Sequence, residues 1–248
     1  MTRLSVNLNK IALLRNQRDL EYPSVTGFAQ LAIDVGADGI TVHPRPDQRH
    51  IRNSDVRDLH ELVRDQDVEF NIEGNPVPEF MALVAQARPD QVTLVPDTPE
   101  QATSDHGWAL RENGKRSAEA SELEVQIGTL KQQGARVSLF MDADPEQIPE
   151  ARAIGADRIE LYTEPWAVAF GTPEEDAVLA RFAAATERAQ RAGLGVNAGH
   201  DLTLANLPAF LSIPNILEVS IGHALMADAL ELGFAGAVRA YLQITRGT

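Results

Sequence analysis

Two kinds of hydrophobic pattern alternate along the chain. Short runs of β-branched and other apolar residues predict strands, and longer segments with apolar residues every three or four positions predict amphipathic helices. We expect eight strands, at residues 3–8, 39–43, 67–72, 91–95, 136–141, 158–162, 194–198 and 217–221. Helical patterns lie between them at 28–37, 56–66, 78–87, 120–135, 145–156, 173–193 and 204–213, and one long helix is expected at 223–243.

Eight cycles of strand and helix favour a closed parallel barrel. Several helical patterns end in a glycine directly before a strand, as at Gly36, Gly134, Gly155 and Gly193, and glycine suits the left-handed end of a helix. No strand is followed by a GxGxxG or GxxxxGK[ST] phosphate loop, which disfavours a doubly wound open sheet. We therefore predict one α/β domain over residues 1–248, folded as a (β/α)8 TIM barrel.

Two connections are longer than a β/α unit requires. Residues 96–116 are polar, and long loops on the catalytic face of a barrel often cover the substrate. Trp108 in this loop is expected to pack on the barrel; the alternative is a disordered surface excursion. Residues 163–172, which include Trp166, form a similar connection.

Polar or ionisable residues stand at the end of almost every predicted strand. In a closed parallel barrel these ends share one face, so residues far apart in the sequence converge on one pocket, as in an enzyme. The residues in question are Asn7, Asn9, His43, Arg45, Glu73, Asp142, Asp144, Glu160, Asn197, His200 and His223.

Histidines are concentrated at these strand ends. Four of the six, His43, His50, His200 and His223, lie at or just after a strand, although any one alone is more often a structural group. Histidine titrates near neutrality, so several around one pocket can relay the protons of a multistep reaction.

Glu73 closes the third strand. A carboxyl group inside the barrel mouth is expected to have a raised pKa, which suits a general base for enolisation. The alternative is a salt bridge with Arg45 on the neighbouring strand. Asp142 and Asp144 are predicted to be structural, because Asp144 precedes Pro145 as an N-cap residue would.

Two Gly-His pairs follow the last two strands, at Gly199-His200 and Gly222-His223. Many barrels bind a substrate phosphate there, on backbone N–H groups at a helix N-terminus, although a chance repeat is the alternative. Strand-end histidines and carboxylates also supply possible metal ligands, but no closely spaced pair such as HxH or HExxH is present. We predict no metal.

Composition narrows the functional classes. The chain has no cysteine, which excludes disulfides, thiolate nucleophiles and sulfur-ligated metals. With 22 basic and 36 acidic residues, the net charge of −14 disfavours a nucleic-acid surface. No segment resembles a signal peptide or a membrane span, so we expect a soluble cytoplasmic protein.

An anionic substrate requires a local positive site in so acidic a chain. Basic residues near the ends of the first two strands provide one, although solvated surface charges are the alternative. These residues are Lys10, Arg15, Arg18, Arg45, Arg49 and Arg52.

Eight stretches resemble, in order, the pyridoxine 5'-phosphate synthase family. They are residues 6–18, 36–51, 70–76, 92–97, 137–144, 159–165, 196–202 and 220–225, and GADGITVHPRPDQRHI and VNAGHDL are highly specific. The resemblance implies a TIM barrel with additional helices, assembled as a homo-octamer. It implies condensation of 1-deoxy-D-xylulose 5-phosphate with 3-amino-2-oxopropyl phosphate to pyridoxine 5'-phosphate, phosphate and water, without a metal or organic cofactor.

The resemblance also implies a role for each matching residue. His43 is the expected proton acceptor, Glu73 the base that drives enolisation, and His200 the proton donor to departing oxygen. Asn7, Arg18, Arg45, His50 and Thr103 are the expected substrate contacts, and Gly222 and His223 the expected phosphate contacts. Asn9, Lys10 and Asp201, which do not match the family pattern, are also predicted to bind substrate.

Three places depart from the family pattern. Asn9-Lys10 replaces Asp-His, Tyr162-Thr163-Glu164 replaces His-Thr-Gly, and Asp201 replaces a frequent glycine. They indicate a subfamily or an altered substrate preference. Two other functions stay open: a metal-dependent sugar-phosphate aldolase or epimerase, and an inactive barrel that only binds a phosphate ligand.

Overall fold

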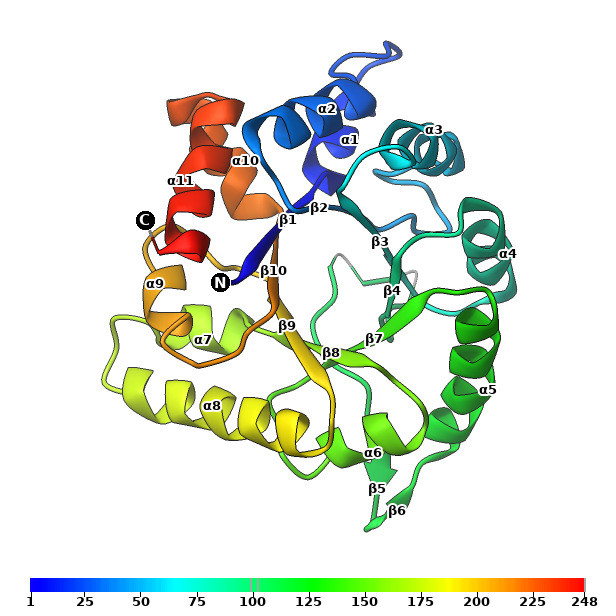
Figure 1. Cartoon of the computed structure of the whole chain (residues 1–248), viewed down its shortest axis with the longest axis vertical. Helices are drawn as coiled ribbons and strands as arrows, with labels where there is room; N and C mark the ends of the chain where they lie inside the picture. The colour runs from blue at the N-terminus through cyan, green and yellow to red at the C-terminus, as the bar shows by residue number, and fades with distance from the viewer. Residues whose placement is uncertain (99, 102, 248) are drawn as a thin grey trace.

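Eight parallel strands close into a barrel in the computed structural model, which describes residues 1–98, 100–101 and 103–247. Figure 1 shows these strands as a central ring surrounded by helices. Around the ring the order is β1-β10-β9-β8-β7-β4-β3-β2, and every predicted strand is confirmed to within two residues at each end. The strands are β1 (Arg3–Asn7), β2 (Gly39–Val42), β3 (Glu69–Gly74), β4 (Gln91–Leu94), β7 (Arg136–Met141), β8 (Arg158–Tyr162), β9 (Gly195–Gly199) and β10 (Glu218–Ile221).

The helices between the strands also follow the predicted pattern. Those confirmed are α2 (Val25–Val35), α3 (Asn53–Val63), α4 (Pro78–Ala87), α5 (Ala118–Gln132), α6 (Ile148–Ala153), α8 (Glu175–Arg191) and α9 (Leu207–Phe210). Among the helices that the structure describes, none is long and apolar enough to cross a membrane.

The single long helix expected after the last strand is wrong. It is broken at Gly233, whose φ of +70° is a left-handed value that suits glycine, into α10 (His223–Leu232) and α11 (Phe234–Arg246). Phe234 and Tyr241 pack into the core, whereas Leu230 and Leu232 on α10 are exposed.

The hydrophobic pattern missed four short elements. They are α1 (Asn9–Arg15), α7 (Glu164–Ala169) and the two-residue strands β5 (Arg111–Glu112) and β6 (Lys115–Arg116). The connection 163–172 is therefore not an open loop: α7 buries Trp166 fully, and its ring lies 5.5 Å from that of Phe170.

The barrel strands carry apolar residues outward and polar residues inward. Outward positions such as Leu4, Ile40 and Val92 belong to the hydrophobic core shared with the helices. Inward positions form hydrogen bonds across neighbouring strands, for example Ser5 Oγ with Thr41 Oγ1 at 2.7 Å. Because buried polar groups require partners, these hydrogen bonds between neighbouring strands stabilise the polar interior of the barrel. Ionisable side chains at the inward strand ends are thus held inside the barrel mouth.

The long connection 96–116 packs onto that mouth, although residues 99 and 102 lie outside the described part. Trp108 is buried, and its Nε1 donates to the carbonyl oxygen of Leu94 at 2.8 Å. Gly107 N donates to Asp142 Oδ1 at 3.2 Å. The expected packing of Trp108 is confirmed, and Asp142 has the structural role expected of it. The expected N-cap role of Asp144 is wrong, because α6 begins at Ile148 with Gln147 as its N-cap residue; Asp144 Oδ1 instead accepts from Glu146 N at 2.9 Å in the turn before α6.

Candidate active site

A pocket of about 430 Å³ lies at the carboxyl ends of the barrel strands. Every predicted site residue except Arg18 lines it. Those residues are Asn7, Asn9, Lys10, His43, Arg45, His50, Glu73, Thr103, His200, Asp201, Gly222 and His223. Side chains from β1, β2, β3 and the segments after β9 and β10 therefore converge, as the barrel prediction requires.

Arg18 is the exception. It is exposed in the segment after α1, where its backbone N–H donates to the Arg15 carbonyl oxygen at 3.2 Å. It is not among the described residues that line the pocket.

Some lining residues were not predicted as site residues. Val95, Phe140 and Ser220 belong to this group, as does Glu160, which was noted only as a strand-end residue. Phe140 and Ser220 stand at inward positions one residue before a strand ends, so a strict inward–outward alternation along each strand would have found them.

His43 leaves the end of β2 and lies between two carboxylates. Its Nδ1 is 3.9 Å from Glu73 Oε2, and its Nε2 is 3.4 Å from Asp97 Oδ2. Asn9 fixes the backbone, because its Oδ1 accepts from His43 N at 2.9 Å. Burial, together with the positive charge of Arg45, lowers the pKa of His43 to about 3. The ring is therefore neutral at neutral pH and has one unprotonated nitrogen.

Glu73 near the end of β3 is a carboxyl group of the site whose side chain is only 12% exposed. Burial raises its pKa well above the usual range, and the carboxylates of Glu160 and Asp97 raise it further, as expected for a carboxyl group in the barrel mouth. Asn7 Nδ2 lies 3.5 Å from Glu73 Oε2. The alternative of a salt bridge between Glu73 and Arg45 is wrong: Arg45 Nη2 instead contacts Asp97 Oδ2 at 2.5 Å.

Glu160 on β8 is a second buried carboxyl group in the same interior. Burial raises its pKa to about 7, against the opposing effects of His200 and a hydrogen bond with Thr93. The neighbouring Gly199 leaves room for it, since a β-carbon at position 199 would lie 2.3 Å from Glu160 Oε1. Glu73 and Glu160 are therefore two interacting carboxyl groups that hold protons more tightly than exposed ones.

His200 follows β9 and sits between two aromatic rings. The ring centroids of Phe140 and Tyr162 lie 5.7 and 5.2 Å from it. Thr163 holds the backbone in place, because its hydroxyl contacts the carbonyl oxygens of both Gly199 and His200. Tyr162, where this chain departs from the family pattern, and Thr163, where it matches the pattern, thus both contact the His200 segment directly.

The backbone turns sharply after His200. His200 and Asp201 both have positive φ values, +85° and +56°, which non-glycine residues adopt rarely. Asp201 Oδ2 lies 3.7 Å from His200 Nδ1, and the hydrogen bond with His200 lowers the pKa of the Asp201 carboxyl group. The aspartate that replaces glycine therefore faces the histidine beside it.

His50 faces the pocket from the loop after β2. Its Nδ1 accepts the backbone N–H of Ile51 at 2.9 Å, so the ring proton is on Nε2. Burial, together with His43 and Arg45, lowers its pKa to about 3. His50 is therefore a neutral hydrogen-bond donor beside the arginines.

The start of α10 lines the pocket two strands from β2 around the ring, because β10 and β2 both pair with β1. Gly222 is its N-cap residue and His223 its first residue, so the free N–H groups of the first turn lie at the pocket. Lys10 also lines the pocket, and its positive charge together with the N-terminus of α10 favours binding of a phosphate there. Within the described residues, no group of three or more histidine, cysteine, aspartate or glutamate side chains is arranged to hold a metal ion.

The fold and pocket define a TIM-barrel protein with an acid/base site and cationic groups on its catalytic face. Solved structures with this fold include a thiamine phosphate pyrophosphorylase from Pyrococcus furiosus (TM-score 0.64, 14% identity, covering 99% of this chain and 96% of that one). A phosphoribosyl anthranilate isomerase from Thermotoga maritima is another (TM-score 0.59, 13% identity, covering both chains fully). At such low identity these likenesses show the fold alone.

Sequence comparison identifies the family. The pyridoxal phosphate biosynthesis protein PdxJ family matches residues 4–247, and the chain belongs to it. A pyridoxine 5'-phosphate synthase from Albidiferax ferrireducens is 55% identical over 249 residues, which cover 98% of this chain and 96% of that protein. One from Chelativorans sp. is 53% identical over 246 residues, covering 97% of each. The resemblance predicted from the sequence motifs is confirmed.

Proposed function

We propose that this protein is a pyridoxine 5'-phosphate synthase. In this reaction 1-deoxy-D-xylulose 5-phosphate and 3-amino-2-oxopropyl phosphate condense to pyridoxine 5'-phosphate, with release of phosphate and water. The observation that carries the proposal is the convergence of neutral His43, proton-binding Glu73 and His200 on one pocket. The names of relatives more than 50% identical over nearly the whole chain support it.

The positions of the three groups suit the three proton transfers of such a condensation. Burial raises the pKa of Glu73 on β3 well above its usual range, which strengthens its carboxylate as a base, and it removes the proton for enolisation. His43 lies beside it and accepts a proton on its free ring nitrogen. His200 follows β9, which stands four strands from β3 around the ring, so it donates to departing oxygen from the opposite wall.

The remaining groups hold the substrates. Arg45 and the Nε2–H of His50 are hydrogen-bond donors on the part of the pocket wall that follows β2. A guanidinium group binds phosphate in a fixed geometry. The α10 N-terminus at Gly222-His223 is the second phosphate site, after β10, which lies two strands from β2 around the ring. Two phosphorylated substrates account for these two sites in a chain with a net charge of −14.

We also propose that the chain acts as one domain in a cytoplasmic homo-octamer. Exposed apolar side chains on the added helices support an assembly. Leu14, Leu20 and Tyr22 lie on or just after α1, and Leu230 lies on α10, which contacts α1. An interface that covers them would remove apolar surface from water.

A product assay tests the proposed function. Purified protein receives both substrates, with and without a chelator, and pyridoxine 5'-phosphate and free phosphate are measured. We expect both products in equal amounts with either treatment. Loss of activity with the chelator would support the metal-dependent aldolase or epimerase instead. No product, with both substrates bound, would support the non-catalytic barrel.

A further inference from the structure

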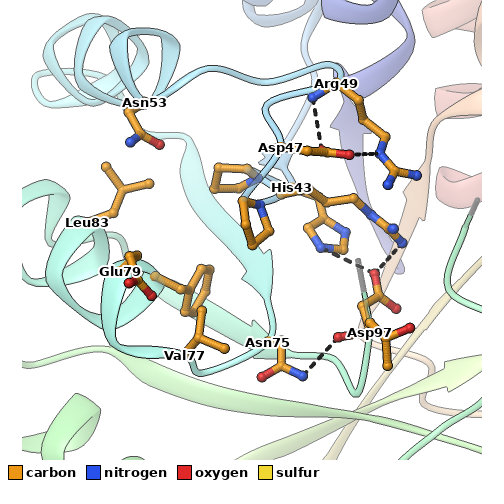
Figure 2. A pocket seen from close by; sticks show the side chains of 14 residues that line it. His43, Asp47, Arg49, Asn53, Asn75, Val77, Glu79, Leu83 and Asp97 are labelled. Atoms are coloured by element: carbon orange, nitrogen blue, oxygen red, sulfur yellow. Dashed lines mark hydrogen bonds and ion pairs between the residues drawn. The ribbon is translucent and has the colours of Figure 1, made fainter. Parts of the chain in front are cut away.

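Asp97 lies behind the active-site pocket, in a position that no site prediction included. It follows β4, is buried, and lines a side pocket of about 390 Å³ between the loops after β2, β3 and β4. Figure 2 shows its carboxylate pointing toward His43, with Asn75 beside it. Asn75 Nδ2 donates to the Asp97 carbonyl oxygen at 3.0 Å, which fixes the backbone at this point. Asp97 does not line the substrate pocket, so its effect on substrate passes through other residues.

Two residues of the active site contact the same oxygen of this carboxylate. Arg45 Nη2 lies 2.5 Å from Asp97 Oδ2, and His43 Nε2 lies 3.4 Å from it. A carboxylate paired with a guanidinium only accepts hydrogen bonds. The nitrogen of His43 that faces Asp97 must therefore be the donor.

This contact decides where the single proton of the neutral His43 ring resides. With the proton on Nε2, the unprotonated nitrogen is Nδ1, which faces Glu73 at 3.9 Å. With the opposite tautomer, the lone pair of Nε2 would face the Asp97 carboxylate, and the nitrogen toward Glu73 could not accept a proton. The partner of one ring nitrogen thus sets the chemistry of the other.

We propose that Asp97 is a positioning residue that holds His43 in the Nε2–H tautomer, so that Nδ1 is free to accept a proton on the Glu73 side. The inference rests on the proposed role of His43 as proton acceptor. Asp97, His43 and Glu73 then form a line in which the outer carboxylate orients the imidazole, as in other sites where a base is oriented by a third group.

The Asp97→Asn variant tests the inference, because asparagine keeps the shape of the side chain but removes the obligate acceptor. We expect kcat to fall by about 100-fold, the usual size of a general acid/base contribution. Asp97→Glu, which restores a carboxylate, should recover part of that loss. Glu79→Gln is the matched control: Glu79 is exposed on the far side of the same side pocket (Figure 2) and should keep wild-type kcat.

A double-mutant cycle separates action through His43 from action through Arg45. If Asp97 acts through His43, adding Asp97→Asn to a His43→Asn protein lowers kcat no further. Full additivity of the two losses would overturn the inference. Wild-type turnover in His43→Asn alone would overturn the role of His43 itself, whereas an inactive His43→Asn with a fully active Asp97→Asn would overturn only the positioning role.

The tautomer can also be observed in the wild-type protein, which avoids any question of folding in the variants. Nitrogen-15 NMR of the histidine rings, with the His43 signals assigned by their loss in His43→Asn, should show a neutral ring protonated at Nε2. A proton on Nδ1 would overturn the inference. In Asp97→Asn we expect the Nδ1–H form to appear; an unchanged tautomer together with lost activity would reduce Asp97 to a structural residue.

Discussion

At the scale of single residues, burial shifts the histidines and carboxyl groups of this site in opposite directions. It lowers the pKa of His43 and His50 to about 3 and raises the pKa of Glu160 to about 7 and that of Glu73 well above its usual range. In each case the low-dielectric interior disfavours the charged form. The two histidines therefore stay neutral through the physiological range, whereas Glu160 titrates within it.

The pH dependence of activity should follow from these shifts. A base must be unprotonated, so kcat/KM should rise with pH as Glu73 loses its proton. The two neutral histidines should not contribute to this rising limb of the pH profile. Glu160→Gln removes a negative charge that raises the pKa of Glu73, so the limb should move to lower pH.

Profiles of kcat/KM between pH 5 and pH 9 measure the shift of the rising limb in Glu160→Gln. Asp105→Asn, at an exposed position of the loop 96–116, is the control. A limb that stays in place or moves to higher pH in Glu160→Gln would show that the two carboxyl groups do not interact as described.

The search for polar residues at strand ends identified His43 and Glu73, because His43 directly follows β2 and Glu73 is the last inward residue of β3. It did not identify Asp97, which lies three residues beyond β4 and acquires its role through contacts with two other loops. The alternative pairing of Glu73 with Arg45 was wrong for a related reason: the loop after His43 places Arg45 against Asp97. Loop geometry of this kind has no periodic signal in the sequence.

At the scale of elements, the hydrophobic pattern missed α1, and this helix supports the active site. Arg15 at its end pairs with the buried Asp55 of α3, and Arg15 Nη2 donates to the His50 carbonyl oxygen at 3.2 Å. Asn16 Nδ2 donates to the same oxygen at 2.8 Å. Arg15 and Asn16, at the end of α1, thus fix the loop that carries His50 by hydrogen bonds. The hydrophobic pattern missed α1 because a helix of 7 residues is too short for a clear amphipathic period.

Arg15→Ala should destabilise the fold, because it leaves the Asp55 carboxylate buried without its cation. Loss of one partner of a buried ion pair costs about 3–5 kcal/mol of unfolding free energy. Urea denaturation measures the change, and Arg57→Ala on the exposed face of α3 is the control. Equal midpoints for Arg15→Ala and the control would contradict a supporting role for this pair.

The loop 96–116 is fixed to the barrel at a point where only glycine fits. A β-carbon at position 107 would lie 2.3 Å from the backbone nitrogen of Asp142 and 2.5 Å from Met141 backbone atoms. Gly107→Ala should displace the loop that carries Thr103, and kcat should fall by at least about tenfold because the substrates are no longer held in place.

Far-UV circular dichroism of Gly107→Ala should match the wild type, since the barrel itself is unaffected. Gly128→Ala is the matched control, because the space around position 128 in α5 is open. Wild-type kcat in Gly107→Ala would show that the loop does not organise the site.

At the scale of the whole molecule, the closed barrel explains why residues from position 7 to position 223 form one site. The eight strands were predictable because the change from short apolar runs to helical spacing repeats eight times. The order of the ring then places β3 opposite β9, and with them Glu73 opposite His200. The break at Gly233 was not predictable from periodicity, because the apolar spacing continues across it into α11.

The central claim is that Glu73 is the base of a condensation in this pocket, and Glu73→Gln tests it most directly. The measurement is pyridoxine 5'-phosphate formed per active site per second by wild type and variant, with the dissociation constants of both substrates determined in parallel. A base acts chiefly in the transition state, so we expect turnover to fall by about 100-fold or more with nearly unchanged substrate affinity. Turnover equal to that of the wild type would contradict the account.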